Sequence, residues 1–212
     1  MKEVHFMYTC ANCTAYACRE EHPEKLPKNC PIRNGELIET AVQTYLQPEN
    51  HTFYVTSSEL EALGYCQWPR IRETIELCLR MGYKKVGLAF CYGLRNEAKI
   101  VDTLLRRAGL DVVSVICKTG GVDKERCGIA DEHKLRPGNF EAMCNPIAQA
   151  MLLNEQKTQF NIALGLCVGH DSMFYKYSDA LVTTLVAKDR VTGHSPAAAL
   201  YCAEGYFKNR VL

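Results

Sequence analysis

The sequence has almost no net charge, with 25 Lys and Arg residues against 24 Asp and Glu residues in a chain of 212. Proteins that bind nucleic acid or an anionic membrane surface through electrostatics carry a clear basic excess. This chain lacks that excess, so we expect no nucleic-acid partner. A small molecule or a partner protein fits the composition better.

Long apolar runs are also missing. No stretch approaches the roughly 20 apolar residues of a membrane-spanning helix, and residues 1–8 mix charged with apolar side chains, unlike the continuous apolar core of a signal peptide. We therefore expect a cytoplasmic protein with no membrane association. The Gly-x4-Gly-Lys-Ser/Thr pattern of nucleotide-binding loops is absent as well, which leaves little support for a nucleotide phosphate site.

Cysteine, by contrast, is abundant: the chain has twelve. In a reducing cytosol such an excess favours metal or redox chemistry over structural disulfides. The alternative for any single cysteine is a small buried apolar side chain. Position along the chain must decide between the two.

The first segment, residues 1–33, contains the pattern C-x2-C-x4-C-x11-C, formed by Cys10, Cys13, Cys18 and Cys30. Two thiolates in C-x2-C share a tight turn, and two more complete the tetrahedral set of a closed metal site. The segment has too little apolar content to fold alone, so a metal would stabilise it. The spacing fits structural zinc, whereas Cys30-Pro31 is also typical of iron–sulfur motifs. We predict a metal centre here; a segment of free thiols is the alternative.

Residues 34–85 are expected to form a helical region packed on the core. Apolar side chains recur at helical spacing in two parts of it. Cys78 lies on one of these apolar stripes, so we expect it to pack in the interior, whereas Cys66 is undecided. Gly82 is placed to end the last helix.

Residues 86–212 alternate between apolar strands and amphipathic helices, which is typical of a parallel sheet covered on both faces. The sequence therefore predicts an α/β fold with a doubly wound, Rossmann-like or flavodoxin-like sheet, preceded by the cysteine-rich segment and the helices. The expected strands are 86–90, 112–117, 161–166 and 181–186, and the expected helices are 94–108, 146–154 and 196–207.

Three of the predicted strands end at or beside a cysteine: Cys91, Cys117 and Cys167. The carboxyl ends of parallel strands share one edge, where ligands bind at the point of strand-order reversal. Strands lie about 4.8 Å apart, so the thiols can converge. Cys144 precedes a helix that should open on the same edge, and it is the natural fourth. We predict one shared metal or cluster site; unrelated packing thiols and a redox dithiol pair are the alternatives.

Titratable residues border the same edge. His170 is a candidate ligand, a proton donor beside the site, or a helix cap, and Asp171 is its orienting partner or a cap. Lys124, in a stretch rich in glycine and charge, is a candidate proton or anion contact. The stretch 188–190 is either a solvated turn or part of a functional rim.

Several blocks of the chain carry a family resemblance. They resemble an uncharacterised domain-of-unknown-function family, described as metal-binding and found largely in anaerobic bacteria and archaea. The resemblance covers nearly the whole chain, is most specific in the last block, and implies metal binding through cysteine with no assigned activity. The blocks are Cys10-x2-Cys13-x4-Cys18, Asn29-Cys30-Pro31, Phe90-Cys91-Tyr92-Gly93-Leu94-Arg95, Cys144-Asn145-Pro146-Ile147 and the stretch 165–194.

Together these patterns predict a cysteine-ligated metal protein with an outer amino-terminal centre and an inner strand-edge centre. Iron–sulfur clusters are the expected cofactors, with zinc as the alternative at the outer centre. Electron transfer or small-molecule redox chemistry would follow, with a redox partner protein or a small molecule as counterpart. Two other functions stay open: a zinc-stabilised protein that binds or senses a small ligand, and an enzyme with Cys167 as nucleophile and His170 as base. The oligomeric state and the question of catalysis are left open.

Overall fold

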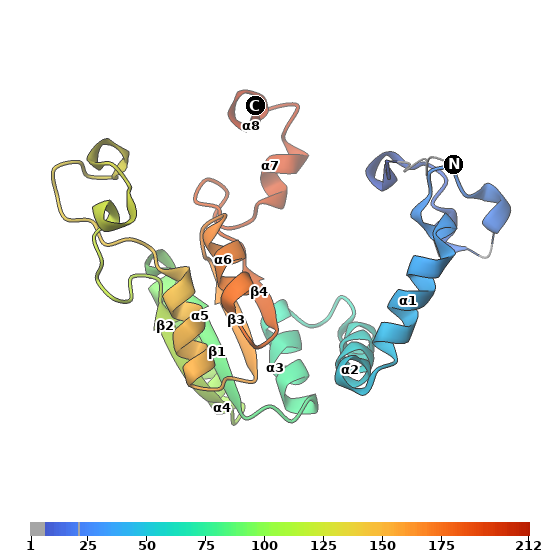
Figure 1. The fold of residues 1–212 in the computed structure, drawn as a ribbon, viewed down its shortest axis with the longest axis horizontal. Helices are drawn as coiled ribbons and strands as arrows, with labels where there is room; N and C mark the ends of the chain where they lie inside the picture. The colour runs from blue at the N-terminus through green and yellow to red at the C-terminus, as the bar shows by residue number, and fades with distance from the viewer. Residues whose placement is uncertain (1–6, 21) are drawn as a thin grey trace. The chain divides into compact units, whose positions relative to one another are not determined.

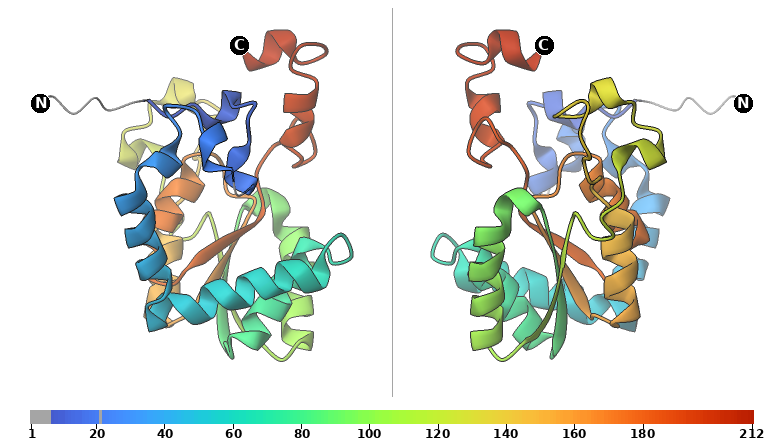
Figure 2. Two further views of the ribbon diagram at one scale, coloured as in Figure 1. Left: turned by 90° about the vertical axis from the view of Figure 1, so that its right-hand side faces the viewer. Right: turned by 90° about the vertical axis from the view of Figure 1, so that its left-hand side faces the viewer.

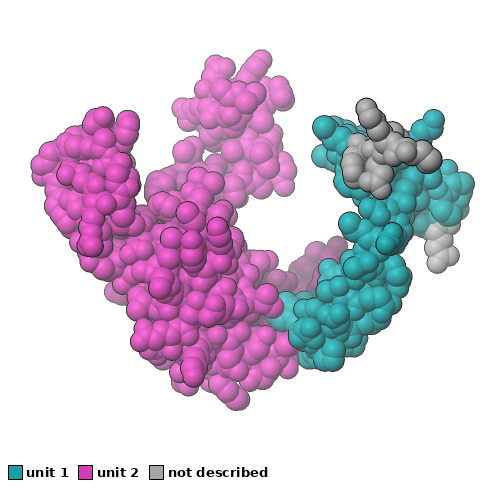
Figure 3. All heavy atoms as spheres, viewed as in Figure 1, with its two compact units in different colours: residues 1–58 teal, residues 59–212 magenta. Residues whose placement is uncertain are grey.

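The computed structural model describes residues 7–20 and 22–212, in two compact units, 1–58 and 59–212 (Figure 3). Residues 1–6, on which part of the argument against a signal peptide rests, lie outside the described part. The predicted helical region 34–85 is divided between the two units.

The first unit begins with short 3-10 helices and continues into a regular helix. Helix α1 spans Gly35–Tyr45, and its first turn is capped by the side chain of Asn34, which accepts from the backbone N–H of Leu37. Helix α2, Pro48–Gly64, starts in this unit. The 3-10 helices are η1 (Cys10–Asn12), η2 (Ala17–Arg19), η3 (Pro23–Lys25) and η4 (Pro31–Arg33).

The second unit contains a parallel sheet of four strands in the order β2-β1-β3-β4 (Figure 1). The α/β fold expected from the alternating pattern is therefore confirmed. Every neighbouring pair runs parallel. The strands are β1 (Lys85–Phe90), β2 (Asp111–Ile116), β3 (Phe160–Leu164) and β4 (Val182–Val186).

Helices cover both faces of this sheet. Helices α3 and α4 lie on one face and α5 and α6 on the other (Figure 2). The chain passes from β1 through α4 to β2 on one side, then crosses back to β3 beyond β1, so the strand order reverses between β1 and β3. That reversal is where an open α/β sheet forms its ligand crevice. The helices are α3 (Arg70–Arg80), α4 (Arg95–Arg107), α5 (Pro146–Glu155) and α6 (His170–Tyr177).

The core is closest-packed where β1 meets β3. Gly87 pairs with Asn161, and an added Cβ at Gly87 would lie 2.0 Å from Asn161 Oδ1 and 2.8 Å from Leu153 Cδ1. Asn161 is fully buried because its amide is satisfied: Nδ2 donates to Ser178 Oγ at 2.7 Å, and Oδ1 accepts from Thr158 Oγ1 at 2.8 Å. Glycine at position 87 makes room for this buried polar pair.

Two expectations for helices have different outcomes. Cys78 is fully buried in α3, as its helical spacing predicts, and burial raises the pKa of its thiol to about 12. The expected single helix 196–207 is wrong: the segment forms α7 (Ala197–Tyr201), followed by a turn and then α8 (Lys208–Val211). Gly205 lies in that turn, and glycine is a poor helix former. Within the described part of the chain, no helix has the length and apolarity needed to span a bilayer.

Candidate functional site

The first two cysteines of the site continue two adjacent strands of the sheet. Cys91 follows β1, and its N–H donates to Leu164 O of β3 at 3.1 Å. Cys117 follows β2, and its N–H donates to Phe90 O of β1 at 2.9 Å. These bonds extend the parallel ladders by one residue. Both thiols are thereby fixed at the carboxyl edge, beside the reversal point.

Cys144 is tied to the same edge by its neighbour. The N–H of Asn145 donates to Cys117 O at 2.7 Å, and the Asn145 side chain caps α5 by accepting from the N–H of Ala148. Lys118 also holds the segment before Cys144 close to the end of β2, since its Nζ donates to Ala142 O at 2.5 Å. The loop that returns from β2 therefore places Cys144 next to Cys117.

Cys167 lies beyond the tip of β3, after a turn at Gly165. Gly165 has a φ of +62°, and an added Cβ would meet the Leu94 side chain at 2.8 Å, so glycine is required there on two counts. The sulfur of Cys167 accepts from Arg190 Nη2 at 3.3 Å. Arg190 follows β4, so a fourth strand contributes to the site.

These four cysteines line one cavity of about 690 Å³. The structure therefore brings together the set that the strand ends suggest, from the tips of three neighbouring strands and the start of α5. Cationic, titratable and apolar side chains also line the cavity, among them Lys118, Lys124, Lys188, Arg190, His133, His170, Glu141, Ile129, Leu135, Met143, Ile147 and Met173.

Three of the thiols are in direct contact. Cys117 hydrogen-bonds to both Cys144 and Cys91, and these bonds, with burial, raise its pKa far above the ordinary value. The same bonds lower the pKa of Cys91 and of Cys144 in spite of their burial. Cys117 therefore holds its proton more tightly than Cys91 and Cys144 do.

Backbone N–H groups and cations surround these sulfurs. Tyr92 N–H donates to Cys117 Sγ at 3.3 Å and Gly93 N–H to Cys91 Sγ at 3.4 Å. Lys188 also hydrogen-bonds to Cys91 and lowers its pKa. Its Nζ lies 3.2 Å from where a Cβ on Gly93 would stand, so Gly93 allows this approach. The thiol-rich end of the cavity is thus matched by positive charge.

The stretch 188–190 lies on the cavity rim as well as in a turn. The hydrogen bond and the electrostatic interaction with Cys167 raise the pKa of Arg190. From the sequence, a solvated turn and a functional rim were equally supported for this stretch. Its position directly after a strand of the same parallel sheet is the signal that favours the rim.

His170 and Lys124 also line the cavity. His170 begins α6, and its charge lowers the pKa of Cys144, after the larger effects of Cys117, burial and Lys118. Lys124 forms an ion pair with Glu141, which lowers the pKa of that carboxyl. Asp171 lies in the first turn of α6, and its Oδ1 accepts from the N–H of Ser172 at 2.8 Å; the N-cap position is Gly169, so the expected capping role is not seen. The chemical roles of His170 and Lys124 stay predictions.

One positioning residue was missed by the sequence analysis. Gln149 of α5 is fully buried, and its Nε2 donates to Val115 O at 2.7 Å and to Phe90 O at 3.3 Å. It thereby joins the ends of β1 and β2, one or two residues before Cys91 and Cys117. A polar residue on an otherwise apolar helix face was the available signal.

The loop between β2 and α5 is organised around a buried lysine. The side chain of Lys134 is only 2% exposed, and its ammonium contacts three carboxylates, those of Glu125, Asp131 and Asp123, together with Asn139 O. The loop carries Lys124, His133 and Glu141 to the cavity. Lys134 therefore holds one wall of the site in place.

This loop should loosen in acid before the sheet does. Contact with Lys134 lowers the pKa of Asp131, so the stabilisation that this carboxylate gives is present above its unfolded pKa of about 3.9 and is lost as pH falls through the lower folded value. We expect amide hydrogen exchange in residues 118–145 to quicken below about pH 4. Lys134→Met should give fast exchange there already at pH 7. Slow, unchanged exchange in that variant would contradict the role given to Lys134.

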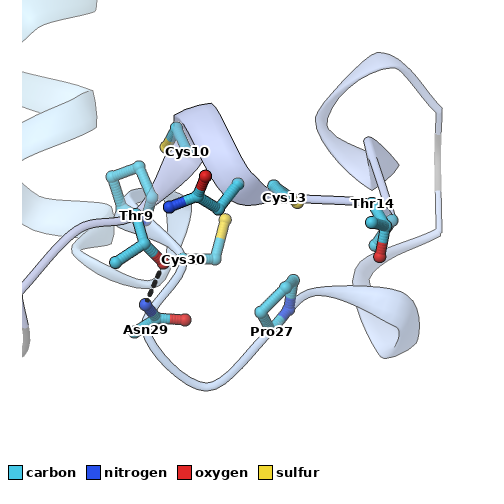
Figure 4. A pocket seen from close by; sticks show the side chains of 10 residues that line it. Thr9, Cys10, Cys13, Thr14, Pro27, Asn29 and Cys30 are labelled. Carbon is cyan, nitrogen blue, oxygen red and sulfur yellow. Dashed lines mark hydrogen bonds between the residues drawn. The ribbon is translucent and has the colours of Figure 1, made fainter. Parts of the chain in front are cut away.

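The amino-terminal cysteines gather only in part. Cys10, Cys13 and Cys30 line a smaller cavity of about 240 Å³. Figure 4 shows Cys10 and Cys13 near η1 and Cys30 on the facing segment, where Asn29 Nδ2 donates to Thr9 Oγ1 at 2.8 Å. Cys18 is placed separately, exposed on η2. The spacing pattern thus yields three neighbours and a fourth thiol elsewhere in the unit.

Among residues 7–20 and 22–212, no three His, Cys, Asp or Glu side chains form a group that could hold one metal ion. The two cavities are candidate metal sites because cysteine thiols, which are good metal ligands, line them. The ligand roles of Cys10, Cys13, Cys18 and Cys30, and of the four inner cysteines, stay predictions.

Residues 30–185 match the family described as protein of unknown function DUF1847. The chain belongs to this DUF1847 family. It is also similar to the uncharacterized protein MJ0455 of Methanocaldococcus jannaschii, with 45% identity over 166 residues, or 78% of this chain and 84% of that protein. The resemblance to a family of unknown function with archaeal members is thus confirmed. The stretch matched to DUF1847 includes all four inner cysteines and Cys30.

Proposed function

We propose that the inner cavity holds an iron–sulfur cluster ligated by Cys91, Cys117, Cys144 and Cys167, and that the protein acts in electron transfer or small-molecule redox chemistry. One observation carries this proposal: four cysteines from four separate elements line one cavity at the reversal point of a parallel sheet. Such edges are where this fold binds its ligands.

The donor set fits such a cluster. Four cysteine thiolates are the usual ligands of [2Fe–2S] and [4Fe–4S] clusters, which supply one-electron chemistry when bound. The N–H groups of Tyr92 and Gly93 already donate to Cys117 and Cys91 sulfurs. Hydrogen bonds of this kind are among the factors that set a cluster's potential. Lys188 and Arg190 would offset the negative charge of the thiolates.

The inner cavity has room for a cluster, since its whole volume, bordered by the four cysteines and the other lining residues, is about 690 Å³. Metal binding would also end the sharing of the Cys117 proton between Cys91 and Cys144, because cysteine ligands lose their thiol protons when they bind metal.

For the outer centre we propose a second cysteine-ligated metal, with zinc and iron–sulfur both compatible. Its support is the cavity shared by Cys10, Cys13 and Cys30. Cys18 as the fourth ligand follows from spacing alone. This centre would act as a structural staple if it holds zinc and as a relay if it holds a cluster.

Anaerobic purification followed by absorption and electron paramagnetic resonance spectra, with iron, zinc and acid-labile sulfide analysis, tests the proposal. We expect a brown protein with iron and sulfide in equal amounts. A colourless protein that holds zinc and no labile sulfide after reconstitution would contradict it and favour the zinc-stabilised alternative.

A second candidate function is thiol chemistry without metal. The lowered pKa values of Cys91 and Cys144 favour it, because the thiolate is the reactive form of cysteine. In the metal-free chain, iodoacetamide at pH 7 should modify Cys144, which is partly exposed, faster than the exposed Cys66 or Cys202. Protection of Cys144 by bound iron would assign it to the cluster instead.

A further inference from the structure

The inner cavity is lined by other side chains besides its thiols. At about 690 Å³ it falls within the range of small-molecule sites, which combine an apolar lining with a few well-placed polar groups. The three contacting thiols mark one part of it, at the strand tips. Five apolar side chains, here called the apolar wall, also line it: Ile129, Leu135, Met143, Ile147 and Met173, of which Leu135 and Met173 are exposed.

The polar groups beyond the thiols are mainly cationic. Lys188 and Arg190 come from the segment after β4, where the backbone is held by Asp189: its Oδ1 accepts from the N–H groups of Val191 at 2.9 Å and Thr192 at 3.1 Å. The backbone is held again where His194 N–H donates to Asp189 O at 2.7 Å. This turn fixes the origin of both cationic side chains.

Acidic side chains are scarce in the lining of the cavity. Among the described residues that line the cavity, the acidic side chain is that of Glu141, and it is paired with Lys124. Arg190 presents a planar fork of N–H donors that matches a carboxylate in two parallel hydrogen bonds. The cavity therefore combines a cationic edge, an apolar wall and a thiol cluster.

From this combination we propose that the cavity binds a small organic anion, a carboxylate with a short apolar body, beside the cluster. The carboxylate contacts Arg190 and Lys188, and the body packs against the apolar wall. This inference rests on the proposed function only in making the anion the substrate of the redox site; Arg190 and Lys188 each have N–H groups beyond the one given to Cys167 or Cys91. It names the substrate class for the redox site, with no reaction step assigned.

Calorimetric titration of the anaerobically reconstituted full chain with acetate, butyrate and butan-1-ol tests the inference. Each buried methylene contributes about fourfold in affinity, so butyrate should bind on the order of fifteenfold more tightly than acetate. Butan-1-ol, which has the body without the charge, should give no binding. Equal affinities for acetate and butyrate would overturn the apolar half of the proposal.

Variants test the cationic half. Arg190→Gln and Lys188→Gln should each weaken butyrate binding at least about tenfold, because each removes a charged hydrogen-bond donor. Arg190→Lys keeps the charge, loses the fork and should fall between. Arg107→Gln, an exposed cation at the end of α4, is the matched control and should bind as the parent does. Unchanged butyrate binding in both Gln variants would overturn the proposal.

Iron and sulfide measured on the same samples keep the two proposals apart. Iron-loaded protein that binds no butyrate refutes the anion site and leaves the cluster standing. Iron-free protein whose butyrate binding depends on Arg190 refutes the cluster and keeps the anion site. Circular dichroism shows whether each variant is folded, and Arg190→Lys serves if Arg190→Gln is not.

Discussion

Replacing Cys117 by serine is expected to remove the iron of the inner centre. Cys117 is the central thiol, buried and hydrogen-bonded to both Cys144 and Cys91. Loss of a group that only supports a metal ligand costs 10–100-fold in metal affinity, so loss of the ligand itself should cost at least about 100-fold. Iron and labile sulfide per chain, after anaerobic reconstitution, measure the effect.

Cys202→Ser is the matched control for this variant, because Cys202 is exposed and lies outside the residues that line the cavity. It should keep the iron and sulfide content of the parent. If Cys117→Ser also kept them, the four strand-edge cysteines could not be the ligands. Iron bound at the outer centre is recognised because a variant without the amino-terminal thiols loses it.

Gly87→Ala should destabilise the second unit by about 3 kcal/mol. The added methyl group would lie 2.0 Å from Asn161 Oδ1, and Asn161 cannot move without breaking its hydrogen bonds to Thr158 and Ser178. For a unit of this size the loss corresponds to a fall in Tm of about 6–12 °C. Thermal unfolding followed by circular dichroism checks it.

The control is Gly205→Ala, where the nearest atom to an added Cβ is Cys202 O at 3.8 Å, an ordinary contact. Its Tm should stay close to that of the parent. A Tm for Gly87→Ala equal to that of the control would mean that β3 can shift away from β1. The tight packing described between these strands would then be wrong.

The sheet was predictable because its strands are short runs rich in apolar and β-branched residues, and each lies within a residue or two of its expected place. The meeting of Cys91, Cys117, Cys144 and Cys167 was also predictable in outline. Parallel strands must place their carboxyl ends together, so residues far apart in sequence share an edge by topology alone. No side-chain geometry is needed for that inference.

The remaining features depend on contacts that leave no periodic trace. The pairing of Arg190 with Cys167 and the link from Gln149 to two strand ends each need the register of neighbouring elements. The burial of Lys134 depends on three carboxylates spread along an irregular loop. The prediction of one continuous helix over 196–207 was wrong because it relied on the alanine-rich composition and ignored the turn that Gly205 allows.

The outer cysteines show a further limit of spacing arguments. A C-x2-C pair shares one turn by necessity, and Cys10 and Cys13 accordingly flank η1. The longer spacings to Cys18 and Cys30 allow several chain paths. Cys30, directly before η4, lines the same cavity as the pair, whereas Cys18 lies on η2. Only the first of these separations could be read with certainty from the sequence.

The central claim is that the strand-edge cysteines hold an iron–sulfur cluster. Iron and acid-labile sulfide in an anaerobically reconstituted variant with Cys10, Cys13, Cys18 and Cys30 all replaced by serine test it most directly, because the inner thiols are then the ones placed to ligate. We expect about two to four iron atoms and as many sulfides per chain. A folded variant with neither iron nor sulfide would contradict it.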